Sequence, residues 1–278
     1  MPFPLRDNVA AVTGAASGIG RATALALAER GCHLALADRD EAGLDATIEQ
    51  AEGHGVRVSR HAFDVTDAAD VRAFPVGVRS AHGRAGVLLN NAGSSIVGHF
   101  EDVSLKEFRW LMEVNFFSVV GLTKAFLPLL SEQPEARLVN VSSLFGLIGP
   151  AEQVAYASSK FAVRGFSEAL RHELEATPVG VTVVHPGGIR TGIAASSRVA
   201  SRMDADAAAR KTKAFTDHAL RLEPEVAAAA IVRGIERRKA RVLIGADARA
   251  GDTLARLSPG RYWSIMRRQY HRITGEVG

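Results

Sequence analysis

The sequence predicts an α/β protein with a doubly wound parallel sheet, arranged as three layers with helices on both faces of the sheet. Strand-like apolar runs alternate with helical stretches along most of the chain, which is the pattern of a parallel sheet covered on both sides. The first apolar run, residues 9–13, leads through a glycine-rich turn into an Ala- and Leu-rich helix. A strand, a glycine-rich turn and a helix together form a binding site for phosphate groups.

The composition limits the chain to one domain of ordinary globular type. At 278 residues, with 47% hydrophobic and 23% charged residues, the chain is long enough for one α/β domain and short for two. Cys32 is the only cysteine, so no intramolecular disulfide can form and a reducing compartment is allowed. No signal peptide and no uninterrupted apolar run near the ~20 residues of a membrane span is recognised, so we expect a cytoplasmic location.

The individual strands are predicted from apolar runs that end at polar or turn-forming residues. These ends lie near Thr13, Asp38, Asp64, Asn90, Ser142, His185 and Gly245. Ligands of such a sheet gather at the carboxyl ends of its strands, so the site is expected there. Pro75 lies inside the helix expected over 67–82. Because proline lacks a donor and clashes with the preceding turn, that helix should be kinked, split or restarted.

The glycine-rich turn is predicted to hold the pyrophosphate of a dinucleotide. Its residues are Gly14, Ser17, Gly18, Ile19 and Gly20, spaced as G-x-x-x-G-x-G rather than the commoner G-x-G-x-x-G. Glycine permits positive φ and close approach of the backbone, while the helix N-terminus offers free N–H groups. The second strand ends in Asp38, eighteen residues after Gly20. A carboxylate at that place is expected to meet the ribose hydroxyls of adenosine.

Tyr156 and Lys160 form a second pattern, since a spacing of four residues puts both side chains on the same face of a helix. A free phenol titrates near pH ~10, and a nearby cation favours its ionised form. This pairing occurs by chance on many amphipathic helices. It therefore indicates acid–base chemistry only in company with the other motifs.

In that company the chain resembles the single-domain short-chain dehydrogenase/reductase family, over about residues 8–248. The resemblance implies a Rossmann-type fold and further cofactor contacts in three segments. These are the adenine contact after the third strand, the Asn-Asn-Ala-Gly turn after the fourth, and the P-G-x-x-x-T segment that closes over the nicotinamide. The residues concerned are Asp64, Val65, Asn91, Ala92, Gly93, Pro186, Gly187, Ile189 and Thr191, with Arg39 beside Asp38.

The resemblance also implies a catalytic tetrad of Asn115, Ser143, Tyr156 and Lys160. Ser143 is preferred over Ser142 because it lies thirteen residues before Tyr156, the spacing usual in the family. Ser143 and Tyr156 would contact the substrate, Ser143 by holding its oxygen and Tyr156 by exchanging its proton. Lys160 would bond the nicotinamide ribose and lower the phenol pKa, and Asn115 would hold a water that links Lys160 to solvent. No metal is implied.

The implied reaction is hydride transfer between a nicotinamide and a fairly apolar ketone or secondary alcohol. Asp38 favours NAD because its charge repels a 2′-phosphate, whereas Arg39 could bind that phosphate and leaves NADP open. One alternative is reduction of 3-oxoacyl groups on acyl carrier protein. This acidic partner should need a basic docking surface beside the site, and the mixed charges of residues 171–177 do not provide one. The other alternative is a non-catalytic dinucleotide-binding regulatory protein. Such a protein would be expected to have lost Tyr156 or Lys160, and both are present.

The chain is expected to form one catalytic domain over 1–248, with a substrate lid at about 192–223, followed by a basic, aromatic extension over 249–278. The extension carries six arginines against Asp252 and Glu276. We expect it to dock on the subunit or on a neighbour with its arginines in water; binding to an anionic membrane surface is the alternative, and nucleic acid is not expected. By resemblance, helices at 104–130 and 156–176 would join subunits into homodimers or homotetramers.

Overall fold

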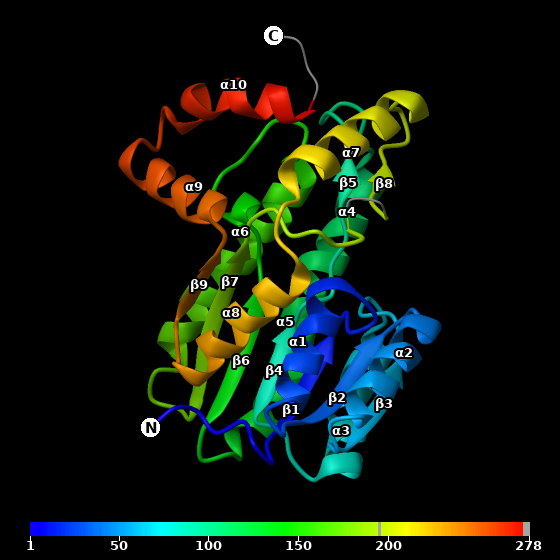
Figure 1. The fold of residues 1–278 in the computed structure, drawn as a ribbon, viewed down its shortest axis with the longest axis vertical. Coiled ribbons are helices and arrows are strands. Elements are labelled where there is room, and N and C mark those ends of the chain that lie inside the picture. The colour runs from blue at the N-terminus through cyan, green and yellow to red at the C-terminus, as the bar shows by residue number, and fades with distance from the viewer. Residues whose placement is uncertain (194–195, 275–278) are drawn as a thin grey trace.

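A seven-stranded sheet with every neighbouring pair parallel forms the centre of the computed structural model, which describes residues 1–193 and 196–274 (Figure 1). The spatial order of the strands is β3-β2-β1-β4-β6-β7-β9. Their bounds are β1 Val9–Thr13, β2 His33–Asp38, β3 Val58–Ala62, β4 Val87–Asn90, β6 Ala136–Val141, β7 Val179–Pro186 and β9 Arg241–Ile244. The strand order reverses between β1 and β4, where ligands of such sheets bind. The predicted doubly wound α/β fold is confirmed.

Helices cover both faces of this sheet and form a separate hydrophobic core on each. One core joins the sheet to α1 and α8, and the other joins it to α3 and α5. Successive residues of β1 alternate between the two cores, Ala10 and Val12 facing one and Val9 and Ala11 the other, as the pleat requires. The covering helices are α1 Gly18–Ala28, α2 Glu41–Glu52, α3 Ala68–His82, α4 Leu105–Met112, α5 Ser118–Ser131, α6 Val154–Glu173 and α8 Pro224–Glu236.

The helix that was expected to be disturbed by proline is continuous, so the predicted split or restart at Pro75 is wrong. Helix α3 runs from Ala68 to His82 with Pro75 inside it. Asp67 caps its start by accepting bonds from Ala69 and Asp70, and Gly83 ends it in the left-handed region with a φ of 77°. Pro75 cannot donate a main-chain hydrogen bond within α3, but it is buried, and burial of its apolar ring is favourable.

Helices α4 and α5 are joined by a π-helical turn, Glu113–Phe117, that the sequence did not predict. The combined stretch, Leu105–Ser131, contains an 18-residue window with a mean hydropathy of 1.5 and is long and apolar enough to cross a membrane by those two criteria. Half of its most apolar window is buried inside the protein, where Leu122 and Phe126 belong to a core of the sheet. The stretch therefore fits a core helix of the folded domain.

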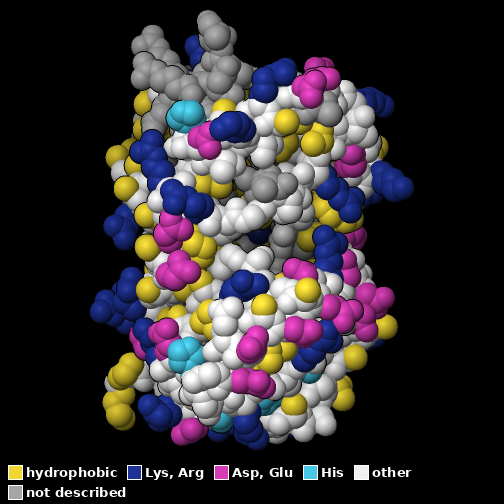
Figure 2. Space-filling view, turned by 45° about the vertical axis from the view of Figure 1, so that its right-hand side comes forward, with side chains coloured by type: hydrophobic (Ala, Val, Ile, Leu, Met, Phe, Trp, Pro, Cys, Tyr) yellow, Lys and Arg dark blue, Asp and Glu magenta, His cyan; other side chains and the backbone are white. Residues whose placement is uncertain are grey.

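A second layer of structure stands above the carboxyl edge of the sheet (Figure 1). It consists of a two-stranded sheet, β5 Ile96–Val97 with β8 Arg198–Val199, and of helices α7 Ala205–Ala219, α9 Ala246–Leu257 and α10 Tyr262–Thr274. Helix α10 packs on α7. Residue 248, the expected end of the catalytic domain, falls inside α9. On the face shown in Figure 2, acidic and basic side chains are interspersed.

Candidate active site

A cavity of about 980 Å³ lies between the carboxyl edge of the sheet and the helices above it. Among the predicted site residues, the cavity is lined by all except Gly20 and Asn115. The ends of six strands, β1, β2, β3, β4, β6 and β7, thus bring together side chains that are far apart in the sequence. No group of three or more side chains able to bind a metal ion occurs among residues 1–193 and 196–274.

The glycine-rich turn has the conformation that a phosphate cradle needs. Gly14 and Gly18 have φ values of 66° and 53°, in the left-handed region that favours glycine. A Cβ on Gly14 would lie 2.8 Å from the Cα of Ala92, and one on Gly20 would lie 1.9 Å from the carbonyl oxygen of Gly14. Gly20 therefore acts by allowing close packing beneath the turn. Since no side chain fills the cradle and helix α1 begins there, the turn fits a pyrophosphate.

Asn91 joins the two strand ends at the point where the strand order reverses. Its Nδ2 donates to the carbonyls of Thr13 and Gly14, each at 3.1 Å, and its main-chain N–H donates to the Thr13 hydroxyl at 3.1 Å. On the other side of the cradle, a Cβ on Gly18 would lie 3.1 Å from Thr191 Cγ2. The turn is therefore bounded by the loop after β4 and by the segment after β7.

The carboxylate of Asp38 stands at the end of β2 with its orientation fixed by the backbone. Its Oδ2 accepts from the N–H of Ala16 at 2.9 Å and its Oδ1 from the N–H of Asp40 at 3.0 Å. The neighbouring guanidinium of Arg39 is bonded to Asp64 at 3.2 Å. Burial opposes ionisation of Asp64, but bonds from Thr66 and Arg39 outweigh it and hold the pKa of that carboxyl below its usual value.

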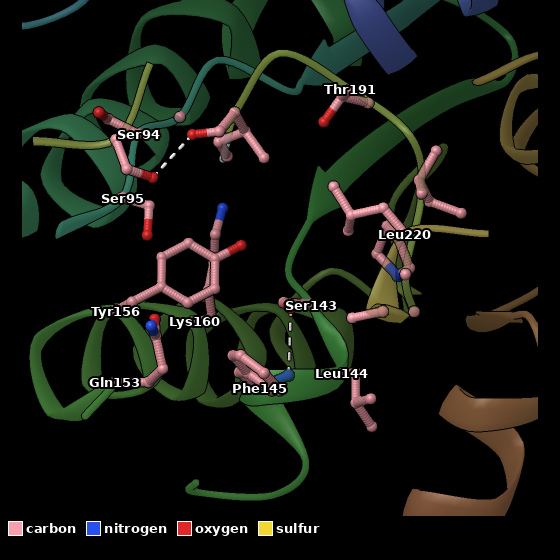
Figure 3. A pocket seen from close by; sticks show the side chains of 18 of the residues that line it. Ser94, Ser95, Ser143, Leu144, Phe145, Gln153, Tyr156, Lys160, Thr191 and Leu220 are labelled. Carbon is pink, nitrogen blue, oxygen red and sulfur yellow. Dashed lines mark hydrogen bonds between the residues drawn. The ribbon is translucent and has the colours of Figure 1, made fainter. Parts of the chain in front are cut away.

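Tyr156 and Lys160 both project from α6 into the cavity (Figure 3). The Lys160 ammonium lies 5.7 Å from the centroid of the Tyr156 ring and donates to the carbonyl of Val141 at 3.2 Å. Burial lowers the pKa of Lys160 to about 8, because an ammonium is poorly stabilised away from water. The two side chains lie together as their spacing on a helix predicts.

The direction of the Tyr156 pKa differs from the sequence-based expectation. Burial raises the pKa of the phenol, and its hydrogen bond with Ser143 lowers that pKa without cancelling the effect of burial. The expected lowering by Lys160 is therefore wrong for this structure. The ammonium lies beside the ring and bonds the Val141 carbonyl, so desolvation decides the direction.

The two adjacent serines at the end of β6 have different surroundings. Ser143 Oγ accepts from the N–H of Phe145 at 3.1 Å and points into the cavity, where its hydroxyl is hydrogen-bonded with Tyr156 (Figure 3). Ser142 Oγ is turned away and donates to the main-chain carbonyl of Lys160 at 2.8 Å. Ser143 is thus the serine placed to meet a substrate, and Ser142 ties strand β6 to helix α6.

Asn115 lies fully buried in the π-helical turn, behind the cavity wall. Its Nδ2 donates to Ser94 O at 3.0 Å and to Ser159 Oγ at 2.9 Å, and its Oδ1 accepts from the Ser94 N–H at 2.8 Å. A Cβ on Gly93 would lie 3.2 Å from Asn115 Oδ1 and 3.4 Å from Lys160 Nζ. Both donors of the amide are used, so the remaining capacity of Asn115 is one lone pair on Oδ1.

One residue that the sequence analysis missed is Asp247, in the first turn of α9. Its Oδ2 accepts from the N–H of Gly188 at 2.7 Å, and a Cβ on Gly187 would lie 2.1 Å from its Oδ1. Asp247 thus fixes the segment that begins with Pro186. Its place directly after the last strand was the available signal, since every strand of a parallel sheet ends at this edge.

The part of the cavity beyond Tyr156 has aromatic and aliphatic walls. The ring of Phe145 stands 6.1 Å from the ring of Tyr156 and 6.4 Å from that of Phe215, between centroids. The large apolar residues that α7, α9 and α10 contribute to the lining are Phe215, Leu254, Trp263, Ile265, Met266 and Tyr270. Beneath a mainly apolar roof of this kind, apolar substrate surface would be removed from water.

The roof is fastened to the loop that precedes the catalytic helix. The hydroxyl of Tyr262 accepts from the N–H of Gly149 at 3.0 Å, and that of Tyr270 donates to the carbonyl of Ala151 at 2.9 Å. Lys211 of α7 forms an ion pair with the buried Glu152 of the same loop. The C-terminal extension therefore lies over the cavity of its own subunit.

The chain is similar in sequence and in structure to known proteins. The family model described as short chain dehydrogenase matches residues 8–201. The protein named "Putative oxidoreductase SadH" of Mycobacterium tuberculosis is 43% identical over 262 residues, covering 93% of this chain and 94% of its own length.

Two solved structures share the fold and were determined with nicotinamide dinucleotides. A short-chain dehydrogenase/reductase from Burkholderia phymatum in complex with NAD gives a TM-score of 0.83 at 29% identity, covering 92% of this chain and 95% of that one. An alcohol dehydrogenase of Thermococcus sibiricus complexed with 5-hydroxy-NADP gives a TM-score of 0.72 at 26% identity, covering 85% of this chain and 95% of that one. The chain belongs to the short-chain dehydrogenase/reductase family and is an oxidoreductase with a dinucleotide-binding Rossmann fold.

Proposed function

We propose that this oxidoreductase transfers a hydride between NAD and an apolar ketone or secondary alcohol. The observation that supports this most directly is the placement of Ser143, Tyr156 and Lys160 on one cavity, between the glycine cradle and the apolar roof. The cradle, the Asp38 carboxylate and the segment from Pro186 to Thr191 would hold the dinucleotide. When bound, the nicotinamide supplies or accepts the hydride.

The protein itself has to hold the reacting carbonyl and to move one proton. Ser143, anchored by the N–H of Phe145, donates its hydrogen to the substrate oxygen. In the direction of reduction, Tyr156 passes its phenolic proton to that oxygen as negative charge develops on it, and in oxidation it takes the proton back. A phenol with a raised pKa stays protonated at neutral pH, which suits the role of donor.

Lys160 serves the proton transfer and cofactor binding together in this proposal. Its ammonium stabilises the phenolate that remains after Tyr156 has given up its proton, and it offers donors to the nicotinamide ribose. With a pKa of about 8, Lys160 can exchange protons close to neutral pH. A water on the remaining lone pair of Asn115 Oδ1 would connect it to solvent.

A second candidate is reduction of 3-oxoacyl groups carried by an acidic acyl carrier protein. It is supported by two exposed arginines, Arg261 just before α10 and Arg267 on α10, beside the roof residues that line the cavity. Assays with free ketones and with carrier-bound 3-oxoacyl groups distinguish the two. We favour the free small molecule because the roof lies over the cavity.

The oligomer and the location are part of the proposal as well. Helices α4, α5 and α6 would pair with those of further subunits in a homodimer or homotetramer. Four exposed apolar side chains on these helices or in the π-helical turn between them support this: Leu105, Phe117, Val154 and Phe161. We infer a cytoplasmic enzyme, in keeping with its one buried thiol, Cys32.

Replacing Tyr156 by Phe should lower kcat by about 100-fold or more, because the ring remains and only the exchangeable proton is lost. The melting temperature and the Kd for NADH should stay unchanged, since Phe keeps the contact with Phe145. Stopped-flow absorbance of NADH consumption measures the rate, and a Tyr156→Phe variant within a few-fold of wild type would contradict the proton transfer.

The enzyme should prefer NAD to NADP in kcat/KM by about tenfold. Asp38 presents a fixed carboxylate where the 2′-phosphate would lie, while Arg39 is engaged by Asp64. Asp38→Ala should narrow or reverse the preference, and Asp45→Ala, an exposed acid on α2, should leave it unchanged. A wild-type kcat/KM at least tenfold higher with NADP would show that Arg39 decides the choice.

Truncation after Ser258, which removes α10, should raise KM for bulky apolar ketones by about tenfold, because Trp263 and Met266 no longer shield them from water. KM for a small ketone and the Kd for NADH should change much less. Helix α9 ends at Leu257, before Ser258-Pro259-Gly260, so the truncation leaves α9 intact. An unchanged KM profile across a ketone series would exclude α10 as part of the substrate pocket.

A further inference from the structure

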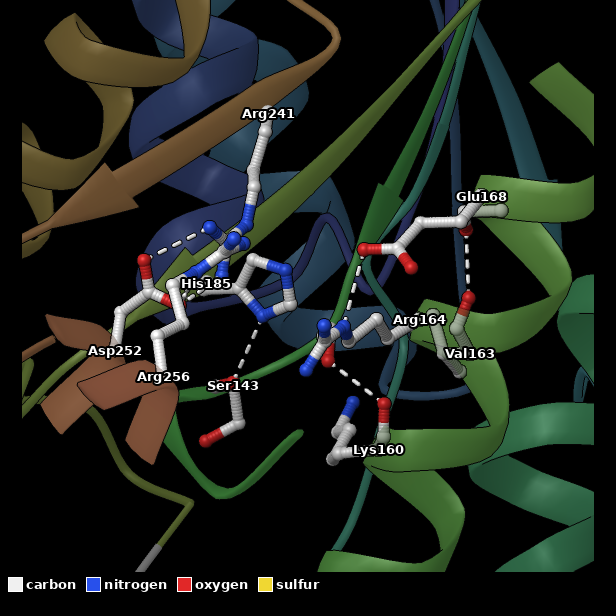
Figure 4. A network of polar contacts seen from close by, with 11 residues as sticks. Ser143, Lys160, Val163, Arg164, Glu168, His185, Arg241, Asp252 and Arg256 are labelled. Carbon is white, nitrogen blue, oxygen red and sulfur yellow. Dashed lines mark hydrogen bonds and ion pairs between the residues drawn. The ribbon is translucent and has the colours of Figure 1, made fainter. Parts of the chain in front are cut away.

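His185 is a fully buried imidazole at the end of β7 that the proposed mechanism does not use. Its Nδ1 lies 3.0 Å from the main-chain carbonyl oxygen of Ser143 (Figure 4). Because a carbonyl oxygen only accepts hydrogen bonds, Nδ1 carries the hydrogen and Nε2 does not. The contact therefore assigns the tautomer of His185.

The Ser143 main chain lies beyond the bonds that hold strand β6 in the sheet. The last ladder bond between β6 and β7 runs from the N–H of Ser142 to the carbonyl of Val184 at 2.8 Å. After it, the Ser143 carbonyl receives the N–H of Gly146 at 3.0 Å and the Nδ1–H of His185 at 3.0 Å. Both of its lone pairs are used, and His185 supplies the only one of these two bonds that comes from another strand.

A polar cluster surrounds the other side of the ring (Figure 4). Arg241 of β9 pairs in register with Val183, so its side chain lies on the same face of the sheet as His185. Asp252 of α9 holds Arg241 through bonds of 2.9 Å and 2.5 Å. On α6, Arg164 and Glu168 form an ion pair at 3.0 Å. The charges that act on His185 are those of Arg241, Arg164 and Glu168. Arg256 belongs to the same cluster and bonds Asp252 at 3.0 Å.

This environment keeps His185 neutral. Burial lowers the pKa of the imidazole to about 4; the bond to the Ser143 carbonyl and the Glu168 charge oppose this, and the Arg241 and Arg164 charges add to it. His185 Nε2 and Arg241 Nε are both buried without a hydrogen-bond partner among the described residues. In the Nδ1–H tautomer, His185 Nε2 carries a lone pair and no hydrogen. The hydrogen bond to the Ser143 carbonyl is the contact that favours this tautomer.

We propose that His185 is a positioning residue, whose Nδ1–H bond to the Ser143 carbonyl fixes the end of β6 so that Ser143 Oγ faces Tyr156. On the other side of the ring, Asp252 of α9 holds the Arg241 guanidinium in place. The inference rests on the role proposed for Ser143. It does not require His185 to touch substrate or cofactor.

The kinetic test compares two replacements of His185. In His185→Leu the donor is lost, whereas in His185→Asn the side-chain amide can donate from the place of Nδ1. We expect His185→Leu to lower kcat and kcat/KM equally, by about tenfold or more, with the Kd for NADH unchanged. His185→Asn should stay within about threefold of wild type.

A double-mutant cycle separates positioning from a general loss of structure. In the Ser143→Ala background, His185→Leu should lower kcat by less than twofold, because its effect acts through the serine hydroxyl. The same fold loss in both backgrounds, or a loss below twofold in the wild-type background, would overturn the inference. If Ser143→Ala alone leaves turnover unchanged, the proposed function fails instead.

A measurement on the unaltered enzyme covers the case in which His185→Leu does not fold. In ¹⁵N-histidine NMR spectra of the native protein, His185 should keep a protonated Nδ1 and an unprotonated Nε2 from pH 8 to pH 5. Assignment follows from the signal that His185→Asn removes. An Nε2–H tautomer or a charged ring at pH 7 would contradict the proposal, whatever the outcome of the kinetics.

Discussion

The buried Lys160 ammonium is the feature on which the arrangement of the site depends. Its residue is 4% exposed, its hydrogen bond is to the carbonyl of Val141, and no salt bridge to it occurs in the described parts of the chain. Buried charges are normally paired, and the lowered pKa of about 8 expresses the cost of leaving this one without a carboxylate. A buried charge that is not paired with a carboxylate destabilises the fold, and such charges are typical of functional sites.

The surrounding chain is shaped to hold that ammonium between β6, α6 and the loop after β4. Ser142 bonds the Lys160 carbonyl, and a Cβ on Gly146 would lie 2.7 Å from that carbonyl oxygen and 2.3 Å from Ser142 Oγ. Gly93 leaves just enough space beside Lys160 Nζ. Small residues and one hydroxyl thus let the strand end and the catalytic helix approach closely. The same approach brings Ser143 and Tyr156 to the same cavity.

The sequence predicts those parts of the fold that depend on patterns of residues close together in the chain. Apolar runs of strand length predict the strand ends, and the glycine turn, Asp38 and the Tyr156–Lys160 spacing predict where the site forms, because each depends on residues close in sequence. The continuity of α3 through Pro75 depends on packing against distant residues, and so does the raised pKa of Tyr156. Asp247 and His185 could not be found from spacing, since their partners lie in other βα units.

The most direct test of this account is a comparison of Lys160→Ala with Lys239→Ala, an exposed lysine before β9 at the opposite edge of the sheet. NADH binding followed by fluorescence and turnover followed by absorbance are measured on both variants. The account predicts that Lys160→Ala raises the Kd for NADH by about tenfold or more and lowers kcat by a larger factor, while Lys239→Ala changes neither. A Lys160→Ala enzyme with wild-type Kd and kcat within a few-fold of wild type would contradict it.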